Sequence, residues 1–190
     1  MDYSALGQAA AETEDLTVAR SVEREIPKEG IAFLRLVDYI ETGRHEPKNP
    51  TYKPSLKCML TFELSHPNHM IEFDGKKVPA KLTVRVNKTY SDKGRYIPLF
   101  KAMNRACGGS CKHFVEMIGK PMMGTIYHNK SEDGKSTYAN LDIDKAWSFV
   151  AAEQVDVINN TTTPVPIPEL VGTPKVFLWE ADGVTDAQIL

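Results

Sequence analysis

The chain has 190 residues and a mass of 21.2 kDa, with 42% hydrophobic and 25% charged residues. This size and composition are typical of one globular domain with tails, and no apolar run approaches the roughly 18 residues that cross a bilayer. Three cysteines are too few for a disulfide framework, so we expect a reducing, cytoplasmic environment. The base-free, acidic first nineteen residues are not typical of a secretory signal.

Charge is distributed unevenly behind a net value of −2. Residues 1–19 carry −4, residues 20–147 carry +7 and residues 148–190 carry −5. Within the basic middle, residues 76–105 hold nine Lys and Arg against Asp92, a local charge of +8. Such a block predicts either a site for a polyanion or a solvated charged face with no ligand, and we expect the first.

The first elements are an arm and a long strand. Residues 1–25 are polar and alanine-rich, and we expect a mobile acidic arm. Residues 31–43 alternate, which predicts a strand with Arg35 and Tyr39 on its aromatic–basic side. The proline-rich segment 43–54 predicts an extended loop.

Two alternating strands and a helix follow. Residues 55–65 place Cys58 and its apolar neighbours on one face, and residues 80–91 alternate in the same way until Lys88, which we expect beyond the core, in solvent. From Gly94 the apolar spacing becomes helical, and Gly108-Gly109 predicts its end. A shorter helix is expected over 111–118.

The remaining chain predicts two strands and a tail. Residues 121–130 and 137–147 are the expected strands, separated by a turn. Residues 148–175, rich in Pro and Thr, predict an extended linker, and residues 176–190 an acidic tail. Residues 26–147 therefore form the expected domain.

Three strands, a helix and two further strands follow the connectivity of the OB-fold. We therefore expect a mainly β, five-stranded Greek-key barrel with a helical connection between strands 3 and 4 and flexible termini. An SH3-like barrel or a half-open sandwich would give a similar pattern.

A resemblance to a known family supports this expectation. The runs EREIPKEGIAFLRLVDYIETGRHE, LKCMLTFEL, KLTVRVNKTYSDKGRYIPLFKAM and FVEMIGKPMMGTIYHNKSEDGKSTYANLD resemble a family of bacteriophage single-stranded DNA-binding proteins built on one OB-fold. The likeness covers roughly residues 24–147 and includes the entry Gly119-Lys120-Pro121 into the fourth strand. It implies binding of single-stranded DNA during phage replication, recombination or repair in the host cytoplasm.

The OB-fold binds a single strand on its second and third strands and on the loops that frame them. Basic side chains attract the phosphates, and aromatic side chains stack on the bases. Each tyrosine could instead pack at the end of the barrel. The expected DNA contacts are Arg35, Tyr39, Arg44, Tyr52, Lys53, Lys57, Arg85, Lys88, Tyr90, Lys93, Arg95, Tyr96, Tyr127, Lys130, Lys135 and Tyr138.

The acidic tail is a second candidate interaction site. A negative segment can cover a basic groove until DNA displaces it, and it can then contact replication or recombination proteins. The residues expected to make these contacts are Trp179, Asp182, Asp186, Ile189 and Leu190. Alternatively, residues 176–179 add an edge strand or pack on the barrel.

Other chemistry has little support in the sequence. Cys107, Cys111 and His113 resemble half of a zinc site, but a second pair is missing, so we expect no metal and no cofactor. The sequence contains no common catalytic motif, and we expect a protein that is not an enzyme. The alternative function is a structural or assembly protein of a phage whose β-barrel binds another protein.

Overall fold

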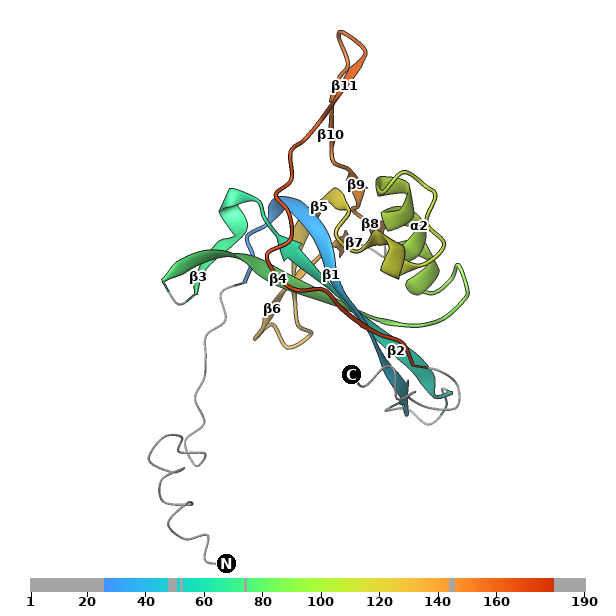
Figure 1. The fold of residues 1–190 in the computed structure, drawn as a ribbon. Helices are drawn as coiled ribbons and strands as arrows, with labels where there is room; N and C mark the ends of the chain where they lie inside the picture. Colours follow the sequence, from blue (N-terminus) through green and yellow to red (C-terminus); the bar gives the residue numbers. More distant parts are fainter. Residues whose placement is uncertain (1–25, 48–50, 52, 74, 144–145, 180–190) are drawn as a thin grey trace, which may run out of the picture.

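The computed structural model describes residues 26–47, 51, 53–73, 75–143 and 146–179. The expected arm over 1–25 and the last residues of the tail lie outside this part of the chain. In this part of the chain the fold is mainly β with one α-helix, as expected (Figure 1). Its elements are β1 (Gly30–His45), β2 (Ser55–Leu64), η1 (Pro67–His69), β3 (Met70–Phe73), β4 (Lys76–Asn87), α2 (Tyr96–Ala106), η2 (Phe114–Met117), β5 (Pro121–Lys130), β6 (Thr137–Asn140), β7 (Asp142–Ile143), β8 (Ala146–Trp147), β9 (Val150–Ala151), β10 (Glu153–Asp156), β11 (Thr161–Pro164) and β12 (Lys175–Phe177).

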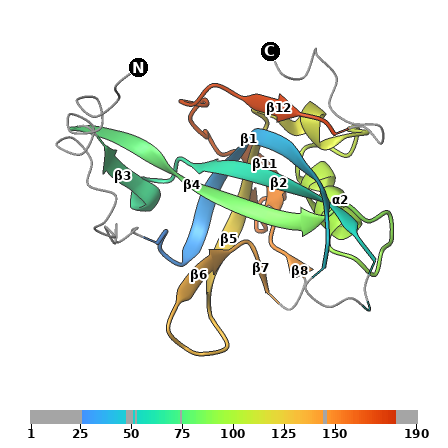
Figure 2. The same ribbon diagram turned by 90° about the horizontal axis from the view of Figure 1, so that it is seen from below.

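One sheet forms the body of the molecule. Its strand order is β3-β4-β2-β1-β5-β6, with β9 beside β5 and β12 beside β1. All pairs in it are antiparallel except β1 and β12. The sheet curls into a half-barrel, with β4 and β6 on opposite sides of its opening (Figures 1 and 2).

The core lies on the concave face of this sheet. Alternation on β2 buries Cys58, Leu60, Phe62 and Leu64, as the sequence predicted. Helix α2 buries Leu99 and the side chains one turn away on the same face, and η2 contributes Phe114 and Met117. Helix and sheet therefore share one continuous core.

Two irregularities in β1 change which side chains face that core. The register with β2 shifts between Leu36 and Asp38, and again between Glu41 and Gly43. A bulge adds one residue to one strand and so reverses the alternation beyond it. Leu34 and Leu36 face inward before the first shift, and Tyr39 and Glu41 are the buried positions after it.

The C-terminal region differs from the expected linker. Residues 148–175 include β9 and the β10–β11 hairpin, and β12 then pairs with β1 in parallel register from Asp38 to Ile40. The strand expected over 137–147 is divided into β6, β7 and β8, and the short helix expected near 111–118 is the 3-10 turn η2. Among the described helices, none has the length and apolar character needed to span a membrane.

Candidate nucleic-acid interface

The convex face of β2 and β4 presents two cations side by side. Residues opposite each other on antiparallel strands share a face, and the pairs here are Lys57 with Asn87, Met59 with Arg85 and Thr61 with Thr83. Lys57 and Arg85 are exposed, and the two threonine hydroxyls lie 3.2 Å apart. This stretch of the face carries positive charge and no carboxylate among its six residues.

A groove continues from this face to β6. It encloses about 260 Å³ between β4 and β6, on the opening of the half-barrel seen in Figure 2. Tyr138 on its β6 side is 55% exposed, so its ring is accessible for stacking. Its lining residues are Thr83, Val84, Arg85, Arg95, Tyr138, Ala139, Asn140 and Asp142. We call this the β4–β6 groove.

Arg95 is held in the groove by two neighbours. Its guanidinium donates to Asp142 Oδ1 at 2.7 Å, and its central carbon lies 4.8 Å from the centre of the Trp147 ring. The carboxylate offsets part of the positive charge, but 44% of the Arg95 side chain remains exposed. Among the described residues, Arg85 has no ion-pair partner, so the groove combines this cation with the partly neutralised Arg95.

Several other predicted contacts also lie at the surface, but on loops and strand ends away from the groove lining. Tyr90 is 78% exposed, and Tyr127 on β5 is half-buried. Tyr52 lies outside the described residues. The predicted contacts that are exposed cations outside the groove lining are Arg44, Lys53, Lys93, Lys130 and Lys135.

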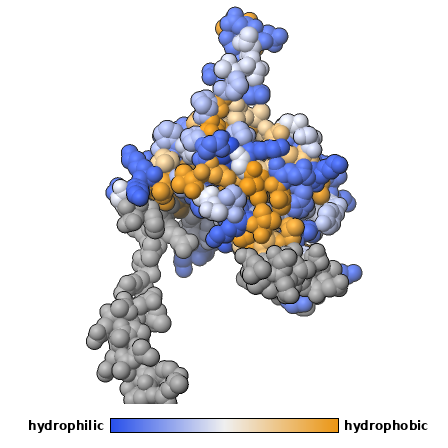
Figure 3. Space-filling model, viewed as in Figure 1, coloured by the Kyte–Doolittle hydropathy of each residue, from blue (hydrophilic) through white to orange (hydrophobic). Residues whose placement is uncertain are grey.

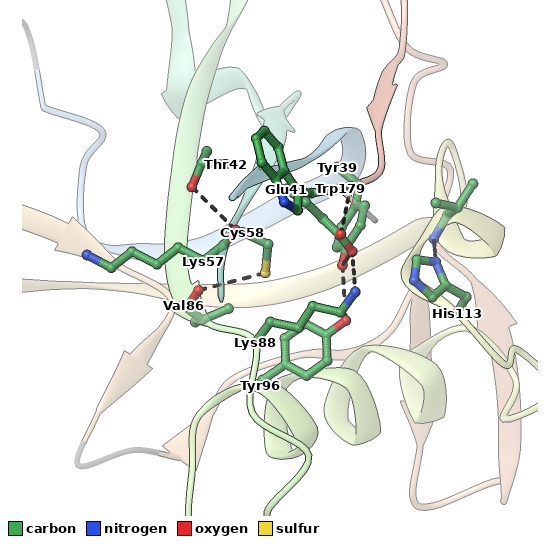
Figure 4. Close-up of polar contacts among 11 residues, drawn as sticks. Tyr39, Glu41, Thr42, Lys57, Cys58, Val86, Lys88, Tyr96, His113 and Trp179 are labelled. Atoms are coloured by element: carbon green, nitrogen blue, oxygen red, sulfur yellow. Dashed lines mark hydrogen bonds and ion pairs between the residues drawn. The ribbon is translucent and has the colours of Figure 1, made fainter. Parts of the chain in front are cut away.

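The predicted DNA contacts Tyr39 and Tyr96 are wrong. Tyr39 is completely buried and Tyr96 is 4% exposed, so neither ring can stack on a base. Their hydroxyls lie 3.0 Å apart, and the Tyr39 hydroxyl donates to Glu41 Oε1 (Figure 4). Burial raises the pKa of Tyr39 above its usual range. The bulge in β1 explains the error, because it turns Tyr39 into the core.

The prediction that Lys88 is a solvated DNA contact is also wrong. Its Nζ lies 2.6 Å from Glu41 Oε1, and 15% of its side chain is exposed (Figure 4). Burial opposes protonation, but the hydrogen bond and charge of Glu41 outweigh it and raise the pKa of Lys88. Lys88 therefore neutralises a buried acid rather than reaching solvent at the end of β4.

The prediction that Arg35 contacts DNA is wrong as well. It is 7% exposed, and its guanidinium donates to the carbonyls of Gly119, Ile167 and Pro168 and to Glu169 Oε1. These acceptors surround the side chain on the convex face of β1. Arg35 therefore holds the C-terminal segment against the sheet instead of contacting a ligand.

The basic block 76–105 does not form one continuous channel. Lys76 and Lys77 lie beside the β3–β4 turn, whereas Arg105 lies near the end of α2. Four cations of the block have carboxylate partners: Lys81 with Glu63, Lys88 with Glu41, Arg95 with Asp142, and Lys101 with Asp92. The candidate nucleic-acid interface therefore contains fewer free cations than the local charge of +8 over residues 76–105 predicts.

The start of the predicted tail is docked. Lys175–Phe177 pairs with β1, the alternative that the sequence left open. The indole ring of Trp179 lies about 3.3 Å from where a Cβ on Gly43 would be, and Gly43 has φ +82°. Asp182, Asp186, Ile189 and Leu190 lie outside the described residues. We call residues 165–179 the strap. Figure 3 shows apolar residues on the face of the molecule along which the strap runs in Figure 1.

Acidic side chains missed by the sequence analysis also hold the strap. Glu63 accepts the N–H groups of Val171 and Gly172, at 2.9 and 2.8 Å. Asp38 accepts the N–H of Lys175, and Glu41 accepts the N–H of Trp179. Each of these carboxylates accepts main-chain N–H groups of the strap. Every residue except proline has such a group, so the side chains of the strap do not reveal these contacts in the sequence.

The cysteine-rich loop has a structural arrangement. Cys111 is buried, with the Lys120 Nζ 3.1 Å from its sulfur, and burial raises the pKa of Cys107 to about 11. His113 Nδ1 accepts the N–H of Val115. Within the part of the chain that the structure describes, no three His, Cys, Asp or Glu side chains are grouped to hold a metal.

A scan against protein-family models, a search of curated proteins and a search of solved structures each find no protein that matches this chain.

Proposed function

We propose that this chain is a non-enzymatic, sequence-independent single-stranded DNA-binding protein that acts in phage DNA replication, recombination or repair. The proposed barrel is an OB-fold made of β1, β2, β4, β5 and β6. The sheet order β4-β2-β1-β5-β6 and the position of α2 between β4 and β5 support this assignment.

The observation that carries the proposal is the convex face of β2 and β4 and its continuation into the β4–β6 groove. Lys57 and Arg85 are diagonal neighbours on this face, and no acid separates them there, so both are available to the phosphates of one strand. Tyr138 across the groove offers a ring for a base, an interaction of about 1–3 kcal/mol. Asn87 opposite Lys57 and Thr83 next to Arg85 add hydrogen-bond donors to the same face.

The choice of DNA and of a phage setting rests on the resemblance of residues 24–147 to the phage family. The strap next to the basic face has no net charge, because its charged residues are Glu169 and Lys175. Glu169 is paired with Arg35, and Glu63 on β2 is occupied by Lys81 and by main-chain N–H groups of the strap. The strap therefore adds little free negative charge beside the groove.

The test is a titration of oligo-dT against duplex DNA of equal length, followed by intrinsic fluorescence. We expect quenching by the single strand alone, with an affinity that falls steeply as salt rises. Lys57→Ala with Arg85→Ala should weaken binding to every sequence alike and reduce the salt slope by about 0.7 for each lost phosphate contact. Tyr138→Leu should weaken binding about tenfold with an unchanged salt slope.

The matched control removes the same charge elsewhere. Lys101 and Lys112 are exposed on α2 and on the loop after it, so Lys101→Ala with Lys112→Ala should leave the affinity nearly unchanged at physiological salt. Equal loss in both double variants would show nonspecific attraction by net charge and would reject the groove. Equal or absent binding of single strand and duplex would favour the alternative, a β-barrel that binds another phage protein.

A further inference from the structure

The β10–β11 hairpin projects from the body without packing against it (Figure 1). All twelve residues from 153 to 164 are exposed, and the two strands pair only with each other within the described chain. An isolated two-stranded hairpin is marginally stable in water. Because all of its residues are exposed, no hydrophobic core stabilises this hairpin.

Apolar side chains are concentrated near the end of the hairpin. Val157 is 85% exposed, Ile158 94% and Val155 63%. The Asp156 carboxylate accepts the N–H groups of Ile158 and Asn159, which fixes the turn that presents these side chains. In Figure 3 the hairpin is a narrow projection, with apolar atoms visible at its end. Exposed aliphatic residues on a fixed turn are typical of a contact with another protein.

An open hollow with a complementary surface lies near the base of the hairpin. It has a volume of about 630 Å³ between the end of α2 and the β8–β9 region. Val150 on its rim is 55% exposed. The apolar part of its lining comes from Ala106, Trp147, Phe149, Val150 and Ala151.

Charge matches the hairpin to this hollow. Arg105 is the charged residue of the lining, and it has no ion-pair partner among the described residues. The hairpin carries Glu153 and Asp156 and no base. The same negative charge would repel nucleic-acid phosphates, so the hairpin is suited to a protein partner rather than to DNA.

The hairpin cannot fill the hollow of its own chain. β10 begins two residues after β9, which lines the hollow, and the paired strands lead the tip away from it (Figure 1). We propose that the tip of one copy, Val157 and Ile158, inserts into the hollow of a second copy beside Arg105. Hairpin and hollow are different surfaces, so the contact is head-to-tail and repeats along a chain or closes into a ring.

The first measurement is sedimentation velocity of the full chain without nucleic acid, which keeps the result independent of DNA binding. We expect the mass to rise with protein concentration. Val157→Asp with Ile158→Asp should give a monomer at every concentration. Val171→Asp, which changes an exposed strap valine, should associate like the unchanged chain.

A mixing experiment tests the head-to-tail geometry. Val150→Glu places an acid in the hollow opposite the acidic hairpin and should also give a monomer. An equal mixture of the tip variant and the Val150→Glu variant retains one intact tip and one intact hollow per pair. It should form dimers that grow no further. Circular dichroism of each variant should match the unchanged chain.

Three results would overturn the proposal. An unchanged chain that stays monomeric up to about 1 mM has no meaningful self-affinity. Association that survives in the tip variant uses another surface. A mixture that stays monomeric, when both variants are folded, shows that the two surfaces do not bind each other.

Discussion

Lys88 Nζ lies 2.6 Å from Glu41 Oε1, and the second oxygen of the same carboxylate accepts the N–H of Trp179 at 2.9 Å. The pair joins the end of β4 to the strap through one buried acid. Glu41 also accepts the hydroxyl of Tyr39. The centre of the molecule therefore depends on a buried charged pair in a place where the sequence pattern predicted the aromatic–basic side of a strand and a solvated lysine.

Removal of Lys88 should destabilise the fold much more than removal of a surface lysine in a similar pair. Lys88→Ala leaves the Glu41 side chain, which is 2% exposed, without its cation, and we expect a loss of about 3 kcal/mol in the free energy of unfolding. Lys101→Ala breaks a pair of nearly the same length, 2.7 Å to Asp92, between side chains that are 64% and 73% exposed. Its cost should be below about 1 kcal/mol. Urea unfolding of both variants measures the difference, and equal losses would contradict the buried pair.

Arg35 should control whether the strap stays docked. Arg35→Ala removes the donor to three main-chain carbonyls, and we expect faster amide hydrogen exchange at Val171 and Gly172 and new protease cleavage within 165–179. Arg44→Ala is the control, because Arg44 is exposed at the other end of the same strand. Unchanged protection of the strap in Arg35→Ala would show that the carboxylates alone retain it.

His113 should make the fold sensitive to mild acid. Burial, with a contribution from the charge of Lys88, lowers the pKa of His113 below 6.5, and its Nδ1 must be unprotonated to accept the N–H of Val115. The unfolded chain therefore binds more protons between the two pKa values, so stability is full above about pH 6.5 and falls as the pH drops below it.

The measurement is the free energy of unfolding between about pH 5 and 7.5. His113→Asn keeps an acceptor for the Val115 N–H but does not titrate, so its stability should fall less with acid than that of the unchanged chain. His69, whose pKa burial also lowers, titrates in both proteins and cancels in the comparison. A difference between the two proteins that does not vary with pH would reject this role for His113.

Gly43 should be needed for the position of Trp179. Gly43→Ala places a methyl group about 3.3 Å from the indole and puts a side chain at φ +82°, and we expect a loss of roughly 1–2 kcal/mol with a red shift of Trp179 fluorescence. Gly75→Ala is the matched control, because φ is +68° there and no heavy atom lies within 4 Å. It should lose a similar stability without the spectral shift. Trp147→Phe in both proteins isolates the signal of Trp179.

Regular alternation made the main strands predictable from sequence. The patterns of 55–65 and 121–130 correspond to β2 and β5, and Leu99 and Met103 mark the buried face of the predicted helix. In these elements the apolar side chains follow the local period, so this part of the core could be inferred without tertiary information, although Glu63 on the outer face of β2 is also buried under the strap.

The errors in the site come from contacts that span the chain. A bulge in β1 turns Tyr39 inward, and its position depends on pairing with β2 rather than on the local sequence. The strap buries Arg35 from 132 or more residues away. A count of positive charges also takes no account of acids such as Glu41 that neutralise them. Lys57, Arg85 and Tyr138 are exposed, as their predicted role requires, because they lie where the alternation is undisturbed.

The strap also imposes an order on biosynthesis. Trp179 follows Glu41 by 138 residues, so a ribosome adding about 5–20 residues per second needs roughly seven to thirty seconds to supply the N–H that this carboxylate accepts. Until then the nascent first strand carries Arg35, Asp38 and Glu41 hydrated and open to solvent. Docking of the strap on β1 is consequently a late event in the synthesis of the chain.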